Sequence, residues 1–388
     1  MEADDDITLS SDIEDEDISN GETTLQPWDP SKIRITTKNF SLREIFDQIK
    51  FLEIDLNPDF QREFVWKQRQ RTRLIESILL GIPLPAFYFN QDEEGRYQVV
   101  DGVQRLSTIY EFMNNKHTLQ ATELEYLFDL NGRNFESLDP AINRRFRSAQ
   151  IVVHIIEPQT PDEVKYDIFN RVNTLGSPLS AQEIRHAMSK DRSRKFLFEL
   201  TTLESFNYAT ASVFWKKDSQ GQFLPDSNRM MNRELALRFC AFSFYESDFY
   251  KNFSSMNTYL VEFLKWIDDP VPKNSASEDS LRDLYLSFDR AMMNSHVILG
   301  NDAFRRYLPN ARKRAPINRA IFEAQSIALA PYSVEELLQN GEKVRLAILS
   351  LFDDDEYTRS VTVGTGSAYR IEYRLYRTQE VVRQALDY

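Results

Sequence analysis

The sequence predicts an α+β protein whose first half mixes strands and helices and whose second half is mostly helical. Up to about residue 190, strand-like runs alternate with helical patterns; beyond it, apolar residues recur at helical spacing. A chain of 388 residues is also long enough for two or three domains. We therefore expect an acidic, disordered tail over residues 1–27, a mixed domain over residues 28–190 and a helical domain over residues 191–388.

Charge is unevenly distributed along the chain. The formal net charge is −13, but the first twenty residues hold nine acidic residues and no Lys or Arg, so the remainder carries only −4. Such an acidic block is typical of a solvated, disordered segment. The alternative is a tail that competes with nucleic acid for a basic groove. The total charge does not exclude a DNA partner, and deleting residues 1–20 is expected to strengthen DNA binding or leave it unchanged.

The composition argues against several classes of protein. No uninterrupted apolar run reaches the roughly 18 residues of a membrane span, because Gly81, Pro83 and Pro85 interrupt the longest candidate. The basic start and apolar stretch of a secretory signal do not occur. The single cysteine, Cys240, permits no disulfide within the chain, and the four histidines lack zinc-ligand spacing. We expect a cytoplasmic protein with no membrane partner and no metal held by its own ligand cluster.

Capping and stop signals delimit the elements of the mixed domain. Ser41 and Glu44 have the spacing of a capping box, which predicts a helix from there to about Lys50. An apolar stripe predicts a second helix over residues 67–80, which Gly81 ends. The other expected elements are an extended segment over 51–60, strands over 86–90, 97–100, 125–129 and 150–156, and helices over 103–114, 161–173 and from Ser180 onward.

The second half is dominated by helical signals. Helices are predicted over 232–244, 256–266, 280–298 and 334–351, with a weaker strand at 360–363 and a short helix at 378–386. Ten aromatic residues between Phe239 and Trp266 fit the core of a helix bundle better than a platform for stacking bases. Cys240 lies among them and is expected to pack in that core.

One junction in the mixed domain has the features of an anion site. A strand ending at Asp101 runs through Gly102 into a helix, whose first backbone N–H groups and positive dipole end attract anions. Arg105 supplies a bidentate donor, and Ser107 and Thr108 supply hydroxyl groups. Asp101 is open to three interpretations: a metal ligand, a group that activates water, or a helix cap. By itself the pattern also fits an ordinary strand–glycine–helix turn.

Four motifs follow one another in the first half of the chain. The first contains Gln61 and Arg62 between aromatic residues, a pattern that also fits an aromatic-anchored loop. The other three are the helix and Gly-Ile-Pro-Leu-Pro at 74–85, Val-Asp-Gly-Val-Gln-Arg-Leu-Ser-Thr-Ile at 100–109, and Phe169–Arg185. In this order they resemble the N-terminal domain of GmrSD-type, modification-dependent restriction systems, a branch of the ParB/sulfiredoxin-like superfamily. The resemblance covers about residues 40–190 and implies a ParB-like first domain.

The resemblance implies nucleotide binding and NTP hydrolysis in a DNA restriction or anti-phage defence system. The nucleotide would be ATP, GTP or CTP, bound with Mg²⁺. Val103 departs from the family's usual Asp-Gly-Gln-Gln-Arg, which puts hydrolysis in question more than binding. The residues implied to be catalytic are Asp101, Arg105 and Gln61, and those implied to bind the nucleotide are Arg62, Gly102, Gln104, Ser107, Thr108 and Asn173.

Many relatives also carry an HNH-type nuclease domain, which needs a histidine base beside metal ligands. His154 lies in a strand-like segment without the expected acid, and His296 stands alone on a helix. We therefore expect a stand-alone member that lacks its own nuclease and acts as a nucleotide-controlled switch on DNA or a partner nuclease. The alternatives are a non-hydrolysing DNA sensor or scaffold with a vestigial pocket, and a nucleotide-licensed nuclease. A homo-oligomer is compatible with the sequence.

Cationic residues gather in three clusters, at residues 62–73, 144–147 and 305–319. The last holds six cations in fifteen residues without an acid, beside two aromatic residues. Such clusters suit a phosphate backbone. Solvated, salt-bridged helix faces account for them equally well.

Overall fold

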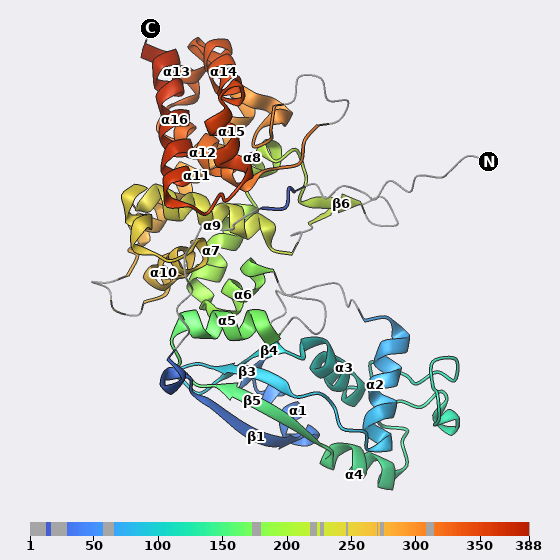
Figure 1. The fold of residues 1–388 in the computed structure, drawn as a ribbon. Helices are drawn as coiled ribbons and strands as arrows, with labels where there is room; N and C mark the ends of the chain where they lie inside the picture. Colours follow the sequence, from blue (N-terminus) through green and yellow to red (C-terminus); the bar gives the residue numbers. More distant parts are fainter. Residues whose placement is uncertain are drawn as a thin grey trace, which may run out of the picture. The chain divides into compact units, whose positions relative to one another are not determined.

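The computed structural model has the expected α+β class and divides into two compact units. The mixed unit comprises residues 26–188, and the helical unit comprises residues 1–25 together with residues 189–388 (Figure 1). The structure describes residues 13–16, 29–56, 66–172, 180–217, 223–225, 229–245, 247–269, 271, 275–307 and 314–387. The candidate site residues Gln61, Arg62 and Asn173 lie outside these described residues.

A five-stranded mixed sheet forms the centre of the mixed unit, with strand order β1-β5-β3-β4-β2. The pairs β1–β5 and β3–β4 are antiparallel, whereas β3–β5 and β2–β4 are parallel. The hairpin expected around residues 92–95 joins β3 to β4. The strands are β1 (Ile35–Ser41), β2 (Ile54–Asp55), β3 (Phe87–Gln91), β4 (Tyr97–Asp101) and β5 (Gln150–Ile156).

Helices cover both faces of this sheet, which explains why neighbouring residues of one strand are both buried. Val99 of β4 belongs to the core formed with α1 to α4, whereas Val100 packs with Phe169 of α5 and Ile184 of α6. Because side chains alternate along a strand, the two clusters lie on opposite faces. The helices are α1 (Leu42–Lys50), α2 (Gln68–Leu80), α3 (Val103–Met113), α4 (Pro140–Ser148), α5 (Asp162–Val172) and α6 (Ala181–Met188).

The capping signals place these helices as the sequence predicts. The Ser41 hydroxyl accepts a hydrogen bond from the Glu44 N–H at 3.2 Å, and Gly81 ends α2 with φ 79°. At α6, Ser180 and Glu183 form a reciprocal capping box, in which the Glu183 carboxylate accepts from the Ser180 N–H at 2.6 Å. Local sequence signals therefore fix the start of α1, the end of α2 and the start of α6.

The strand predicted over residues 125–129 is wrong. The buried carboxylate of Glu76 on α2 accepts hydrogen bonds from the backbone N–H groups of residues 125, 126 and 127, at 2.7–3.0 Å. A side chain from another element therefore binds the donors that a neighbouring strand would have used. A 3-10 turn follows at Phe128–Leu130.

The helical unit contains the predicted helices, with three differences near its end. The short helix predicted over residues 378–386 is the last part of a 20-residue helix, α16 (Ala368–Asp387). The helix predicted over residues 334–351 is divided at Asn340, whose φ of −122° is not helical. Residues 360–362, predicted to begin a strand, lie in α15, because Asp354 caps that helix. The elements are α7 (Asp191–Thr201), α8 (Glu204–Ala209), β6 (Trp215–Lys217), β7 (Phe223–Pro225), α9 (Met231–Phe244), α10 (Met256–Asp268), α11 (Glu278–Leu299), α12 (Arg319–Leu329), α13 (Val334–Gln339), α14 (Gly341–Ser350), α15 (Asp355–Thr362) and α16 (Ala368–Asp387).

The aromatic residues of α9 and α10 form the core of this unit, as predicted. Phe239, Tyr259 and Phe263 are fully buried, and the Tyr259 hydroxyl donates to the Ala241 carbonyl at 2.8 Å. Cys240 is also fully buried, and burial raises the pKa of its thiol, so the thiolate form is disfavoured. This cysteine is a packing residue.

Residues 13–16 differ from the expectation of a disordered tail, because they pack in the helical unit. Ile13 is buried, and the Glu14 N–H donates to the Ile317 carbonyl at 2.8 Å. The Glu16 side chain is only 8% exposed and lies among arginines. Acidic composition favours disorder when the carboxylates face water. Here fixed cations compensate two of the carboxylates, and Ile13 makes an apolar contact.

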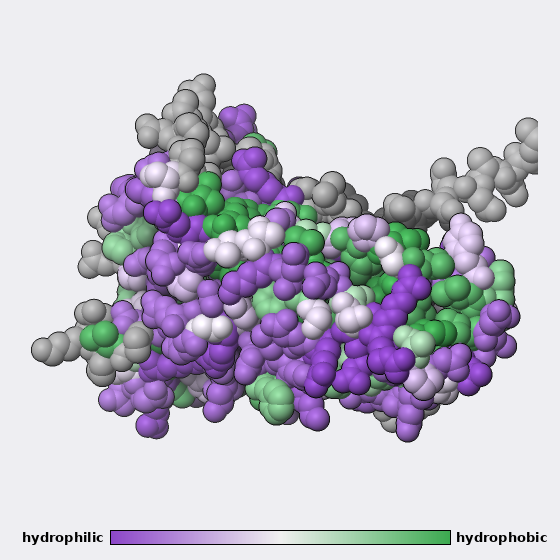
Figure 2. Space-filling view, turned by 90° about the horizontal axis from the view of Figure 1, so that it is seen from below, coloured by the Kyte–Doolittle hydropathy of each residue, from purple (hydrophilic) through white to green (hydrophobic). Residues whose placement is uncertain are grey.

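The surface is mostly polar on the face seen from below (Figure 2). Hydrophilic side chains predominate there, and hydrophobic residues form separate patches between them. In the part of the chain that the structure describes, no helix is both long and apolar enough to cross a membrane.

Candidate functional site

The strand–glycine–helix junction predicted from the sequence is present. β4 ends at Asp101, Gly102 has φ 99°, and α3 begins at Val103. A Cβ on Gly102 would lie 2.3 Å from Cδ1 of Phe87, so glycine is needed for both backbone conformation and space. The first hydrogen bond of α3 runs from the Leu106 N–H to the Gly102 carbonyl at 2.9 Å. The preceding N–H groups have no partner within the helix and can receive an anion.

Arg105 is anchored beside this junction. Its Nη2 lies 2.7 Å from Oδ2 of Asp101 and 3.2 Å from the Ala86 carbonyl, while Nη1 donates to the Pro85 carbonyl. The guanidinium carbon also lies 4.1 Å from the centre of the Phe87 ring. Burial lowers the pKa of Arg105, and the Asp101 carboxylate opposes that shift. Arg105 therefore holds the start of β3, and a phosphate group would have to share its donors with Asp101.

The other candidate residues of α3 differ in their burial and in whether their side chains have hydrogen-bond partners. The side-chain Oε1 of Gln104 is buried and has no hydrogen-bond partner among the described residues. Thr108 is fully buried, and its hydroxyl donates to the Gln104 carbonyl at 2.7 Å, within its own helix. Ser107 is half-buried, and the Asp101 side chain remains one-third exposed.

The last sequence motif packs against the same strand as the junction. Val100, which directly precedes Asp101, shares a buried cluster with Phe169 and Ile184. Next to that cluster, Arg185 is 1% exposed, and its Nε donates to Oε1 of Gln182 at 2.8 Å. Two segments about 70 residues apart in the sequence thus meet at one end of β4. The site consists of Asp101, Gly102, Gln104 and Arg105, with α5 and α6 as neighbours.

Comparison with protein families supports the resemblance read from these motifs. Residues 42–189 match the family model of the GmrSD restriction endonuclease, N-terminal domain. Residues 42–189 are a GmrSD N-terminal domain. No curated protein matches the chain. The GmrSD domain begins with α1 and ends directly after α6, so it includes both motif segments, and it relates the chain to DNA restriction and defence systems.

Sequence reasoning missed Phe87 and the two carbonyls that bind Arg105. Their signal was present: Pro85 ends the Gly-Ile-Pro-Leu-Pro segment of the second GmrSD motif, which leads directly into β3. The glycine of the next motif then packs on Phe87. The spacing alone does not show that these two motifs contact each other.

The GmrSD domain shows no preformed metal cluster in its described residues, where no group of three or more His, Cys, Asp and Glu side chains could hold a metal ion. Asp101 supplies one carboxylate at the junction. That fits Mg²⁺ carried by a nucleotide, because Mg²⁺ commonly uses one or two carboxylates together with phosphate oxygens and water.

His154, one of the two histidines considered for nuclease chemistry, makes contacts that stabilise the fold. It lies on β5, where its Nδ1 is 2.8 Å from the Thr37 hydroxyl oxygen and its ring stands 4.9 Å from that of Tyr88. The segment is a strand, as its alternating pattern predicts. These contacts explain the histidine without a catalytic role.

The basic clusters differ in how much of their charge is compensated. Arg71 and Arg73 on α2 form ion pairs within the mixed unit. Three arginines of the 305–319 cluster are also paired with carboxylates, within the helical unit. Arg144 and Arg145 on α4 are exposed. Lys67 and Arg69 are exposed as well, so the start of α2 and helix α4 both present cations to solvent.

Proposed function

We propose that the GmrSD domain binds a nucleoside triphosphate at the β4–α3 junction, and that nucleotide state controls DNA restriction through DNA or a partner nuclease. The observation that supports this most is that Oε1 of Gln104, at the start of α3, is buried and has no hydrogen-bond partner among the described residues. The N–H groups of residues 103–105 would receive phosphate oxygens, and Gln104 would accept a hydrogen bond from a ribose hydroxyl or base amine.

The charged pair at the junction would serve the phosphates. Mg²⁺ bound with the nucleotide would neutralise phosphate charge, and Asp101 would hold it or orient water. Arg105 would transfer part of its hydrogen bonding from Asp101 to a phosphate oxygen. Gln61, Arg62 and Asn173 complete the proposed pocket by their match to the family motifs. ATP, GTP and CTP are all candidates, and we propose a cytoplasmic location.

Direct binding of ATP, GTP and CTP in the presence of Mg²⁺ tests the proposal. Gln104→Ala should weaken binding by about tenfold, the loss expected for one hydrogen bond worth about 1.4 kcal/mol. Arg96→Ala is the matched control, because Arg96 pairs with Asp92 in the hairpin beyond the other end of β4. Arg105→Ala and Asp101→Ala should weaken binding further, with circular dichroism checking the fold. If the wild-type protein binds none of the three nucleotides, the proposal is wrong.

A nucleotide-binding sensor without turnover is the second candidate. Two observations favour it: Val103 in place of the family's glutamine, and the ion pair that occupies Arg105 and Asp101. Restoring the amide with Val103→Gln separates the candidates. We expect faster phosphate release from this variant if the remaining catalytic groups are present. Binding without release by both proteins would favour the sensor.

A further inference from the structure

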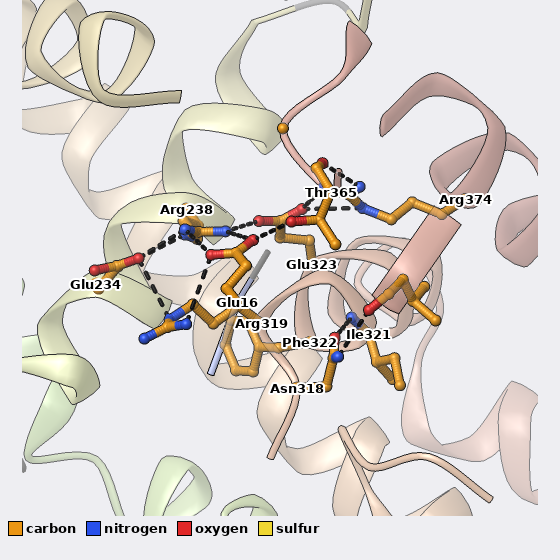
Figure 3. A network of polar contacts seen from close by, with 12 residues as sticks. Glu16, Glu234, Arg238, Asn318, Arg319, Ile321, Phe322, Glu323, Thr365 and Arg374 are labelled. Atoms are coloured by element: carbon orange, nitrogen blue, oxygen red, sulfur yellow. Dashed lines mark hydrogen bonds and ion pairs between the residues drawn. The ribbon is translucent and has the colours of Figure 1, made fainter. Parts of the chain in front are cut away.

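The acidic N-terminal segment and the basic 305–319 cluster meet in the helical unit (Figure 3). Ile13 forms a parallel bridge with Ile317, which is bridged on its other side by Arg305. Together with the hydrogen bond from the Glu14 N–H, this bridge holds residues 13 and 14 alongside the segment preceding α12, as an added strand would be held. Many domains bind peptides by this kind of strand addition, with pockets for individual side chains.

Glu16 enters a site built to hold an anion. Its Oε1 and Oε2 accept hydrogen bonds from Nη1 and Nη2 of Arg238 at 3.0 and 2.7 Å. The Thr365 hydroxyl donates to Oε1 at 2.7 Å, and Arg319 Nη1 lies 3.6 Å from Oε2. Both the bidentate guanidinium and the neighbouring cation favour a carboxylate here.

The helices around Glu16 contribute more arginines than carboxylates to this network. Glu323 is fully buried and forms ion pairs with both Arg238 and Arg374, and Glu234 pairs with Arg238 and Arg319. Among the described residues drawn in Figure 3, three arginines therefore face two helical glutamates, and Glu16 supplies the third carboxylate. A buried arginine without its carboxylate is strongly unfavourable, so the site requires an acidic occupant.

We propose that the helical unit carries a binding site for short acidic segments of the pattern Ile-Glu-x-Glu, and that residues 13–16 are its resident, exchangeable ligand. The first position is buried, and the second is a carboxylate 3.2 Å from Nε of Arg306. The third, Asp15, is exposed and free to vary, and the fourth fills the Arg238 site. A partner protein with a segment of this pattern would compete for the site. This inference does not depend on nucleotide binding.

Cleaving the folded chain tests whether the resident segment exchanges, without a refolding step. A specific protease site inserted after Asn20 allows the full-length protein to fold before the segment is released. A fluorescent peptide of residues 9–20 should then bind the cut protein, and Glu16→Ala in the peptide should weaken binding by about tenfold or more. The matched control peptide, Asp15→Asn, should bind as the original does. Uncut protein should bind the peptide much more weakly, since a tethered segment competes at an effective concentration of about a millimolar.

A second measurement avoids cleavage altogether. In the uncut chain, the double substitution Glu14→Gln and Glu16→Gln weakens the resident segment and should admit the fluorescent peptide. No binding to either protein at about 100 µM peptide, or equal binding of the Glu16→Ala peptide, would overturn the proposal. A DNA duplex that displaces the peptide as effectively as unlabelled peptide would assign the site to nucleic-acid phosphate and would overturn it as well.

Discussion

Gly102 is the residue where the backbone of the candidate site is most constrained. Gly102→Ala places a Cβ against the Phe87 ring at a φ of 99°, so we expect the free energy of unfolding to fall by about 3 kcal/mol or more. Gly132→Ala is the control: its φ is 73°, but nothing lies within 4 Å of the added Cβ, and about 1 kcal/mol is expected. Urea unfolding measures both. Equal losses would show that the contact with Phe87 is unimportant.

His117 gives the mixed unit a pH-dependent stability. Burial, with a smaller contribution from the charge of Arg71, lowers its pKa to about 4. The unfolded chain, with a histidine pKa of about 6.5, takes up the proton first as pH falls. The free energy of unfolding should therefore decrease between about pH 6.5 and pH 4, by at most about 3 kcal/mol. Urea unfolding at several pH values measures how steeply the free energy of unfolding depends on pH. This dependence should be smaller in His117→Asn, and an unchanged dependence would mean that other groups cause it.

At the scale of single elements, the predictions were right where residues within a segment determine its boundaries. They were wrong where a side chain distant in the sequence determines the structure of the segment. Ser41, Gly81 and Ser180 set helix boundaries from within their own segments, and the structure confirms each. Residues 125–127 instead have their N–H groups held by Glu76, about 50 residues earlier in the sequence. A sequence pattern contains no sign of that partner.

The Glu76 contact can be tested as the cause. Glu76→Ala leaves three backbone donors without their acceptor, which should cost about 3 kcal/mol and speed hydrogen exchange at residues 125–127. Glu125→Ala is the control, since its half-exposed carboxylate pairs with Arg73 and should contribute at most about 1 kcal/mol. Unchanged exchange in Glu76→Ala would mean that other contacts hold this segment.

Helix α4 carries two exposed arginines whose contribution to DNA binding can be tested. Arg144 and Arg145 are exposed there, and exposed arginines bind phosphates by releasing counterions. Replacing both with Gln should lower DNA affinity and reduce the slope of log affinity against log salt by about 2. The control replaces Arg43 on α1 and Arg96 in the β3–β4 hairpin, whose carboxylate partners reduce their availability. An unchanged slope in the α4 variant would exclude this helix from the interface.

At the scale of the whole molecule, the sequence predicted the strand–glycine–helix junction but not the contacts made around it. Asp101, Gly102, Gln104 and Arg105 are close in sequence, so a strand–turn–helix brings them together. The pairing of Arg105 with the carbonyls before β3 depends on sheet order, which short motifs do not specify. The same limit concealed the pairing of the acidic segment with the 305–319 cluster, because its partners come from both ends of the chain.

Glu16 links the N-terminal segment to the stability of the helical unit. Burial alone would raise the pKa of Glu16, but the charge and hydrogen bond of Arg238, together with the charge of Arg319, outweigh it, so the pKa lies below its ordinary value. This stabilisation is full above the ordinary glutamate pKa of about 4.3 and is lost as pH falls through the lowered value. At pH 7, Glu16→Gln should reduce the free energy of unfolding by about 3–5 kcal/mol.

Two comparisons check that expectation by urea unfolding. Asp15→Asn, at the exposed neighbouring position, should change stability by no more than about 0.5 kcal/mol. The difference between wild type and Glu16→Gln should shrink as the solution is acidified below about pH 4. Deletion of residues 1–20 is then expected to destabilise the helical unit, so its effect on DNA binding has to be measured together with its effect on folding.

The hydrogen bond between Glu16 and Thr365 also sets an order of events during synthesis. The chain leaves the ribosome N-terminus first, and these two partners are separated by 349 residues. At about 5–20 residues per second, the acidic segment waits roughly 20–70 s for its final contacts. Its charges keep it soluble during that delay. Because the partners of Glu16 lie on α9, at the start of α12 and between α15 and α16, its binding site is complete only after Thr365 has been made.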